Sequence, residues 1–253
     1  GRISWITFAD RLMEFPTALL GVALGTVLLP ALAKHHADEN THQYSSLLDW
    51  GLRLAFVLAL PAAVALWILA VPLISTLYQY GRFSVEDVLQ TRTALIGYSV
   101  GLLGLTLVKI LAPGFYARQL MRTPVKIAFV TVVVTQTLAV ILMFPLGHGG
   151  LTLATSLGAC VNAGLLALFL RRRGIYTPHA GWLQFISRLV VALFVLGLAL
   201  FALSGPASYW LHAGLWEKVG RLALVMGGGA IAYFGALWLL GVRPRDFNRT
   251  DAI

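Results

Sequence analysis

Near the start of the sequence, an apolar stretch contains three charged side chains within a segment of five residues. Glu14 follows Asp10 by four positions and Arg11 by three, so a helix would direct all three into one sector. They could form an internal ion pair that neutralises itself. Alternatively, they could line a water-filled cavity in which Arg11 meets an anionic substrate and the two acids hold the arginine in place. We favour the cavity, because an ionic face directed into lipid would be costlier than either arrangement.

Lys109 is a further cation inside an apolar stretch, nine residues before Arg118. Its long stem could extend the ammonium group towards the lipid headgroups. Equally, the ammonium could be a second point charge for phosphate in the same cavity as Arg11. The sequence leaves both interpretations open.

Motifs of known catalytic chemistry are absent from the sequence. It contains no HExxH pair, Walker loop or GxSxG elbow, and no aspartate-rich motif for a metal pyrophosphate. The single cysteine, Cys160, allows no intrachain disulfide and no cysteine-based metal site. We interpret the remaining acids as scattered loop residues: Asp38, Glu39, Asp49, Glu86, Asp87, Glu217, Asp246 and Asp251. We therefore predict no enzymatic activity, no cofactor and no metal site.

The elements that position these charges are predicted to lie in a membrane. Hydrophobic residues make up 58% of the chain and charged residues only 11%, with a mean hydropathy of +0.81. A soluble domain has about 25% charged residues. The net charge of +9 does not indicate nucleic-acid binding, because the basic residues lie in short loops and form no stripe with interleaved aromatics.

Seven apolar runs are long enough to cross a bilayer, which needs roughly 20 helical residues. They predict an all-α, polytopic transmembrane helical bundle. The runs cover approximately residues 3–33, 54–77, 94–116, 125–144, 151–170, 185–203 and 219–240. Pro16, Pro61, Pro72 and Pro113 interrupt several of them and predict kinks, which neighbouring membrane helices tolerate.

The distribution of Lys and Arg predicts how the chain is oriented. Twelve lie near the loops after spans one, three and five and in the C-terminal tail: Lys34, Arg53, Arg118, Arg122, Lys126, Arg171, Arg172, Arg173, Arg188, Arg243, Arg245 and Arg249. Five lie towards the opposite side: Arg2, Arg82, Arg92, Lys218 and Arg221. Because cytoplasmic loops hold the excess of Lys and Arg, we predict a cytoplasmic C-terminus.

Several strings closely resemble the MurJ/MviN family of lipid II flippases. They are ADRLMEFP at residues 9–16, GVALGTVLLP at 21–30, QYGRF at 79–83, KILAPGFYAR at 109–118 and TPVKIA at 123–128. The resemblance runs almost to the C-terminus and corresponds to helices eight to fourteen of a fourteen-helix exporter fold. Because the sequence starts at Gly1 and enters an apolar run almost at once, we expect a fragment that lacks the N-terminal lobe.

The resemblance implies a function and a division of the chain. Residues 1–175 would form the C-terminal lobe of the transporter core, and residues 176–253 an additional helix pair with a cytoplasmic tail. The two lobes would alternately open a central cavity to each side of the bacterial inner membrane, moving lipid II, the undecaprenyl-pyrophosphate-linked disaccharide-pentapeptide. Arg11 would be the cavity arginine, with Asp10 and Glu14 as its acidic neighbours, and the last two spans would hold the lipid tail in a groove.

Two features of the resemblance limit what it implies. The missing lobe supplies most of the family's cavity arginines. Some relatives bind sodium through carboxylates in helices corresponding to spans four and five, yet those spans contain no acid here and Asn162 offers only a neutral ligand. Two other functions stay open, namely export of another amphiphile within the same superfamily and a non-transporting scaffold in the cell-wall machinery.

Overall fold

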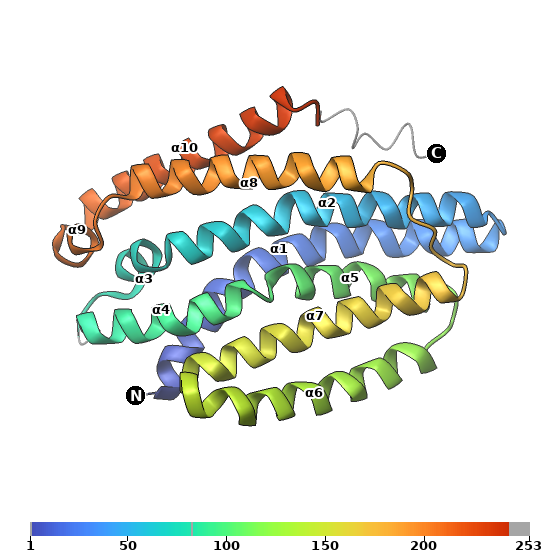
Figure 1. Ribbon diagram of the computed structural model, residues 1–253, viewed down its shortest axis with the longest axis horizontal. Coiled ribbons are helices and arrows are strands. Elements are labelled where there is room, and N and C mark those ends of the chain that lie inside the picture. The colour runs from blue at the N-terminus through green and yellow to red at the C-terminus, as the bar shows by residue number, and fades with distance from the viewer. Residues whose placement is uncertain (1, 82, 243–253) are drawn as a thin grey trace.

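The computed structural model describes residues 2–81 and 83–242, and within them the chain forms ten helices and no strand. The helices lie side by side along one long axis (Figure 1). Their bounds are α1 Arg2–Ala37, α2 Thr41–Ile68, α3 Ala70–Tyr78, α4 Val85–Ser99, α5 Leu102–Tyr116, α6 Arg122–Leu146, α7 His148–Arg172, α8 Trp182–Ser204, α9 Ala207–His212 and α10 Leu215–Leu239. Seven segments are long and apolar enough to cross a membrane, which confirms the all-α class and the seven spans.

The second span differs most from its sequence prediction. Helix α2 begins at Thr41, well before the expected start near residue 54, because the Asn40 side chain caps it by accepting from the Gln43 N–H at 3.0 Å. The first half of α2 carries polar residues, so hydropathy alone does not reveal it. Asp49 therefore lies inside a helix and is buried, which corrects its assignment to a loop. The helix ends at Ile68, because Pro72 has no N–H to donate to the Ile68 carbonyl. Helix α3 follows as a separate helix.

The third span also begins earlier than expected and is broken in the middle. Ser84 and Asp87 form a capping box at the start of α4, so Glu86 and Asp87 belong to its first turn rather than to a loop. The span is interrupted at Val100 and Gly101 and continues as α5. Together α4 and α5 make one membrane-crossing segment, residues 85–116.

Two hydrophobic cores hold the bundle together. One joins the second half of α2 to the first half of α1 and to α3, α4, α8 and α10. The other joins the first half of α2 to the second half of α1 and to α5 and α7. Helices α8 and α10 pack on each other and reach the rest of the bundle through α2 and α3 (Figure 1). The loops at 38–40, 117–121 and 173–181 lie at one end of the bundle, and α10 runs towards that end but stops short of it (Figure 1). We call this the basic end. Four arginines of the charge count lie outside the described residues, namely Arg82, Arg243, Arg245 and Arg249.

Helix α6 forms one flank of the bundle and packs mainly against α7. Its outer surface is mostly apolar, and Phe129 and Phe144 remain 72% and 88% exposed. An apolar surface of this size is incompatible with water but is suited to lipid or to another membrane helix.

Helices pack closely at Gly97 and Gly101. A Cβ atom on Gly101 would lie 2.5 Å from the Cα of Ser156 on α7, and one on Gly97 would overlap the Thr152 hydroxyl. The two glycines of α1, Gly21 and Gly25, have different surroundings. Gly21 touches the Lys109 side chain, whereas Gly25 faces open space.

Replacing Gly101 with alanine is expected to lower the free energy of unfolding by about 1–3 kcal/mol, because the Ser156 backbone must move to admit the methyl group. Gly164→Ala on α7 is the matched control: nothing lies within 4 Å of its Cβ position, so it should be neutral or slightly stabilising. Equilibrium unfolding of the full-length protein in mixed micelles measures both. Equal stability of the two variants would contradict the tight α5–α7 contact.

Candidate functional site

Helix α1 has one buried face and one open face. Its buried positions recur every three or four residues, as Ala9, Met13, Thr17 and Gly21 do, and this face packs on α2, α4 and α5. The open face lines a groove of about 760 Å³. The groove is lined by Arg11, Glu14, Phe15, Ala18, Leu19, Val22 and Ala23. An arginine and a glutamate therefore stand at the end of an otherwise apolar groove on a membrane-spanning helix.

The charges of α1 are not paired with one another. Within the described residues, every ion pair involves Asp49, and none joins Arg11 to Asp10 or Glu14. Arg11 is exposed on the open face and is not enclosed in dry packing. This arrangement leaves the guanidinium free to bind an anion.

Asp10 lies on α1 beside the groove. It is exposed but does not line the groove, and it is close enough to Glu14 and to Tyr98 on α4 for electrostatic interaction. The structure thus brings Arg11 and Glu14 together at one surface and sets Asp10 at its edge.

Lys109 connects two helices. Its Nζ donates to the Thr17 carbonyl oxygen at 2.9 Å, and its stem crosses α1 where Gly21 has no side chain. The ammonium is therefore bound to the backbone of α1, although its side chain stays exposed. Thr17 follows Glu14 by three residues, so this contact lies next to the groove without lining it.

Replacing Lys109 with methionine is expected to lower the free energy of unfolding by about 1–2 kcal/mol, because the hydrogen bond to the Thr17 carbonyl is lost while the apolar stem remains. Lys126→Met, at an exposed position of α6, is the control and should leave stability unchanged. Unfolding in mixed micelles measures both. A Lys109→Met variant of normal stability would contradict this structural role of the ammonium.

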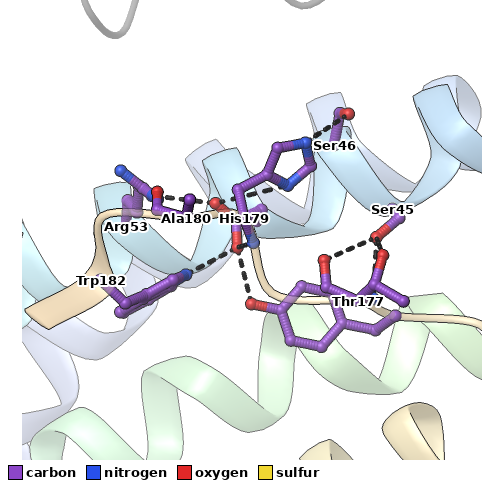
Figure 2. A network of polar contacts seen from close by, with 9 residues as sticks. Ser45, Ser46, Arg53, Thr177, His179, Ala180 and Trp182 are labelled. Carbon is purple, nitrogen blue, oxygen red and sulfur yellow. Dashed lines mark hydrogen bonds and ion pairs between the residues drawn. The ribbon is translucent and has the colours of Figure 1, made fainter.

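Asp49 organises a polar network that the sequence did not suggest. Its Oδ1 accepts from the Tyr176 hydroxyl and the Trp182 indole N–H, each at 2.7 Å, and from the His179 backbone N–H at 3.3 Å. Its Oδ2 accepts from Arg53 Nε at 2.9 Å. Figure 2 shows His179, Trp182 and Arg53 gathered beside α2. The one signal in the sequence was the spacing of four between an acid and an arginine, which is common on helix surfaces.

The same network fastens the 173–181 linker to α2 (Figure 2). Ser45 exchanges hydrogen bonds with Thr177, and Arg53 Nη2 donates to the Ala180 carbonyl at 3.1 Å. Burial, and then the hydrogen bond to Asp49, raise the pKa of Tyr176, so its hydroxyl keeps its proton and remains a donor. The linker therefore fixes where α8 begins relative to α2.

A second, apolar groove lies between α2, α8 and α10. It has a volume of about 260 Å³, and its walls include Leu58, Pro61, Leu196, Met226 and Tyr233. The Tyr233 hydroxyl is satisfied by the Val57 carbonyl at 2.7 Å, which leaves only apolar groups to face a ligand. The resemblance implied a groove for a lipid tail at these last two spans.

Comparisons with known proteins agree with this architecture. The family model described as "Lipid II flippase MurJ" matches residues 1–219. The lipid II flippase MurJ of Burkholderia cenocepacia is 49% identical over 98% of this chain and 48% of its own length. The probable lipid II flippase MurJ of Vibrio cholerae is 38% identical over 98% of this chain and 47% of its own.

A solved structure has the same fold. A lipid II flippase MurJ in an inward closed conformation superposes with a TM-score of 0.75 at 22% identity, over 97% of this chain and 48% of that one. This chain spans about half the length of the curated relatives it matches.

Proposed function

Because the chain belongs to the lipid II flippase MurJ family, we propose that it is the C-terminal half of a transporter that moves lipid II across the bacterial inner membrane. The observation that carries the proposal is the groove on α1, where Arg11 and Glu14 face open space at membrane depth without pairing. An unpaired arginine at this depth is costly unless water or an anionic ligand surrounds it. The pyrophosphate of lipid II is an anion of this kind.

The mechanism follows from the two grooves. In the full-length protein the open face of α1 would face the missing lobe and close one side of a central cavity. Arg11 would bind the pyrophosphate or the peptide carboxylates through charge-assisted hydrogen bonds, and Glu14 would lie beside it in the same groove. The apolar groove between α2, α8 and α10 would hold the lipid tail. Rocking of the two lobes would then expose the headgroup alternately to each side.

The orientation is part of the same proposal. The loops rich in Lys and Arg lie at the basic end, and we assign that end to the cytoplasm. The missing N-terminal lobe is the expected partner, and membrane lipids surround α6. Labelling of cysteines introduced at Asp38 and at Trp216 by an impermeant reagent in intact cells tests this orientation, since only the second should react.

Depletion of the full-length protein in growing cells tests the proposed substrate. If the protein is a lipid II flippase, its depletion should cause lipid-linked peptidoglycan precursor to accumulate in the inner leaflet, and lysis should follow. An exporter of another amphiphile would leave the precursor pool unchanged. A scaffold would tolerate neutralisation of all three charges of α1 at normal expression, whereas a transporter that uses them would not.

A further inference from the structure

A small polar cavity lies at the basic end, between α2, the start of α8 and the end of α10. It has a volume of about 280 Å³. Two arginines line it, Arg53 from α2 and Arg188 from α8, together with Gln184 and the backbone at Ala180 and Gly181. It is separate from both the groove on α1 and the apolar groove, and the proposed transport does not use it.

The cavity presents many hydrogen-bond donors that have no acceptor. A guanidinium has five N–H donors. The bonds of Arg53 use its Nε, to Asp49, and its Nη2, to the Ala180 carbonyl. Arg188 has neither an ion pair nor a hydrogen bond within the described residues, and it is half-buried. Gly181 caps α8 without a side chain, so the first backbone N–H groups of that helix also remain available.

The charges around the cavity leave it positive. Among residues 2–81 and 83–242, Asp49 is the one acid that forms an ion pair with a residue of the lining, and it neutralises Arg53 from the buried side. Arg188 is not neutralised by any described acid, and the start of α8 adds a partial positive charge. The end of α10, at Gly241 beside Arg188, favours a cation there but occupies none of its donors. An anion would complete the site.

The depth of the cavity in the membrane identifies the kind of anion. Helix α8 has 23 residues and is therefore about 35 Å long, just enough to cross the hydrocarbon core. Trp182, its first residue, consequently lies at the interface, where tryptophan is favoured. Arg188 starts six residues deeper and extends back to the cavity, as long basic side chains do near helix ends.

We propose that this cavity binds the phosphate group of an anionic lipid at the membrane interface. Basic cavities between transmembrane helices at this level are suited to phosphate headgroups. Two arginines and a helix start supply the donors, and Phe185 and Val242 supply apolar walls for the adjoining glycerol or alkyl chain. Since Arg53 and the linker belong to the Asp49 network, a bound lipid would also hold α8 and α10 against α2. The proposal requires only that the chain lie in a membrane and does not depend on transport.

Native mass spectrometry of the full-length protein tests the site, with lipids added singly to delipidated protein. The probes are phosphatidylglycerol, zwitterionic phosphatidylethanolamine, a polyprenyl pyrophosphate and inorganic phosphate. Arg188→Gln should weaken binding of the anionic lipid by about tenfold, the effect of losing charge-assisted hydrogen bonds. Arg188→Lys should restore part of it, and Arg172→Gln, an exposed arginine at the same end, should bind as the wild type does.

The pattern of losses distinguishes the sources of phosphate. A loss confined to phosphatidylglycerol assigns the site to a bulk membrane lipid, and a loss confined to the polyprenyl pyrophosphate assigns it to the carrier lipid. Unchanged binding of both by Arg188→Gln, at wild-type stability, overturns the proposal. An equal loss of binding in Arg172→Gln also overturns it, since attraction to the basic surface would then suffice. A third contradicting result is that Arg188→Gln and the wild type bind inorganic phosphate equally and show no preference among the lipids.

Discussion

Replacing Arg11 with alanine in the full-length protein is expected to reduce lipid II transport by about ten- to one-hundredfold and to abolish growth at normal expression. The physical reason is that Arg11 is the cation on the open face of α1, at membrane depth, with no acid bound to it. A hydrogen bond to a charged group is worth about 1.5–3 kcal/mol, and each 1.4 kcal/mol is tenfold. Complementation of a depleted strain measures growth, and accessibility of lipid II to an external probe measures transport.

Two companion variants separate the role of Arg11 from a general effect of charge. Arg11→Lys keeps the charge but loses the planar donor pair, so we expect partial activity. Arg92→Ala removes an exposed arginine from α4 at the opposite end from the basic loops and should grow normally. Wild-type growth of Arg11→Ala, with the protein present in the membrane in normal amount, would refute the role assigned to the α1 groove.

The fold could be predicted from the sequence wherever a helix is apolar along its whole length. The spans at α6, α7, α8 and α10 agree within a few residues, because lipid on the outside and packing on the inside both require apolar side chains. The prediction was wrong where helices extend beyond the bilayer or stop inside it. The start of α2 is polar, and α2 and α3 are separated next to Pro72 in a continuous apolar run, so hydropathy could not place either boundary.

The candidate site was predictable in part. Contacts between residues close in the sequence could be predicted, and contacts between distant residues could not. The spacing of Arg11 and Glu14 placed them on one face of a helix, and the structure puts both in one groove. The carbonyl that Lys109 binds is 92 residues away, and the donors to Asp49 from the linker and the start of α8 are about 130 residues away. No local pattern encodes such partners. Asp49 is not a scattered loop residue, as the sequence suggested, because its side chain is buried among donors from the distant linker.

Replacing Asp49 with alanine is expected to lower the free energy of unfolding by about 3 kcal/mol. Its carboxylate is 6% exposed and receives hydrogen bonds from Tyr176, Trp182, His179 and Arg53, which would all lose their acceptor at once. Breaking a buried ion pair costs about 3–5 kcal/mol, and the lower value applies because Arg53 keeps 25% of its side chain exposed and regains water. Equilibrium unfolding of the full-length protein in mixed micelles measures the change.

The part of the chain that Asp49→Ala loosens is as informative as the loss in free energy of unfolding. Because Asp49 holds the 173–181 linker, its loss should also speed cleavage by trypsin at Arg171–Arg173, while cleavage elsewhere at the basic end stays constant. Asp38→Ala, which changes an exposed acid at the same end, controls for surface charge and should alter neither quantity. If Asp49→Ala unfolds like the wild type with an equally protected linker, then α8 and α10 are held to α2 by apolar packing alone. In that case the polar network would follow the position of the helix pair instead of setting it.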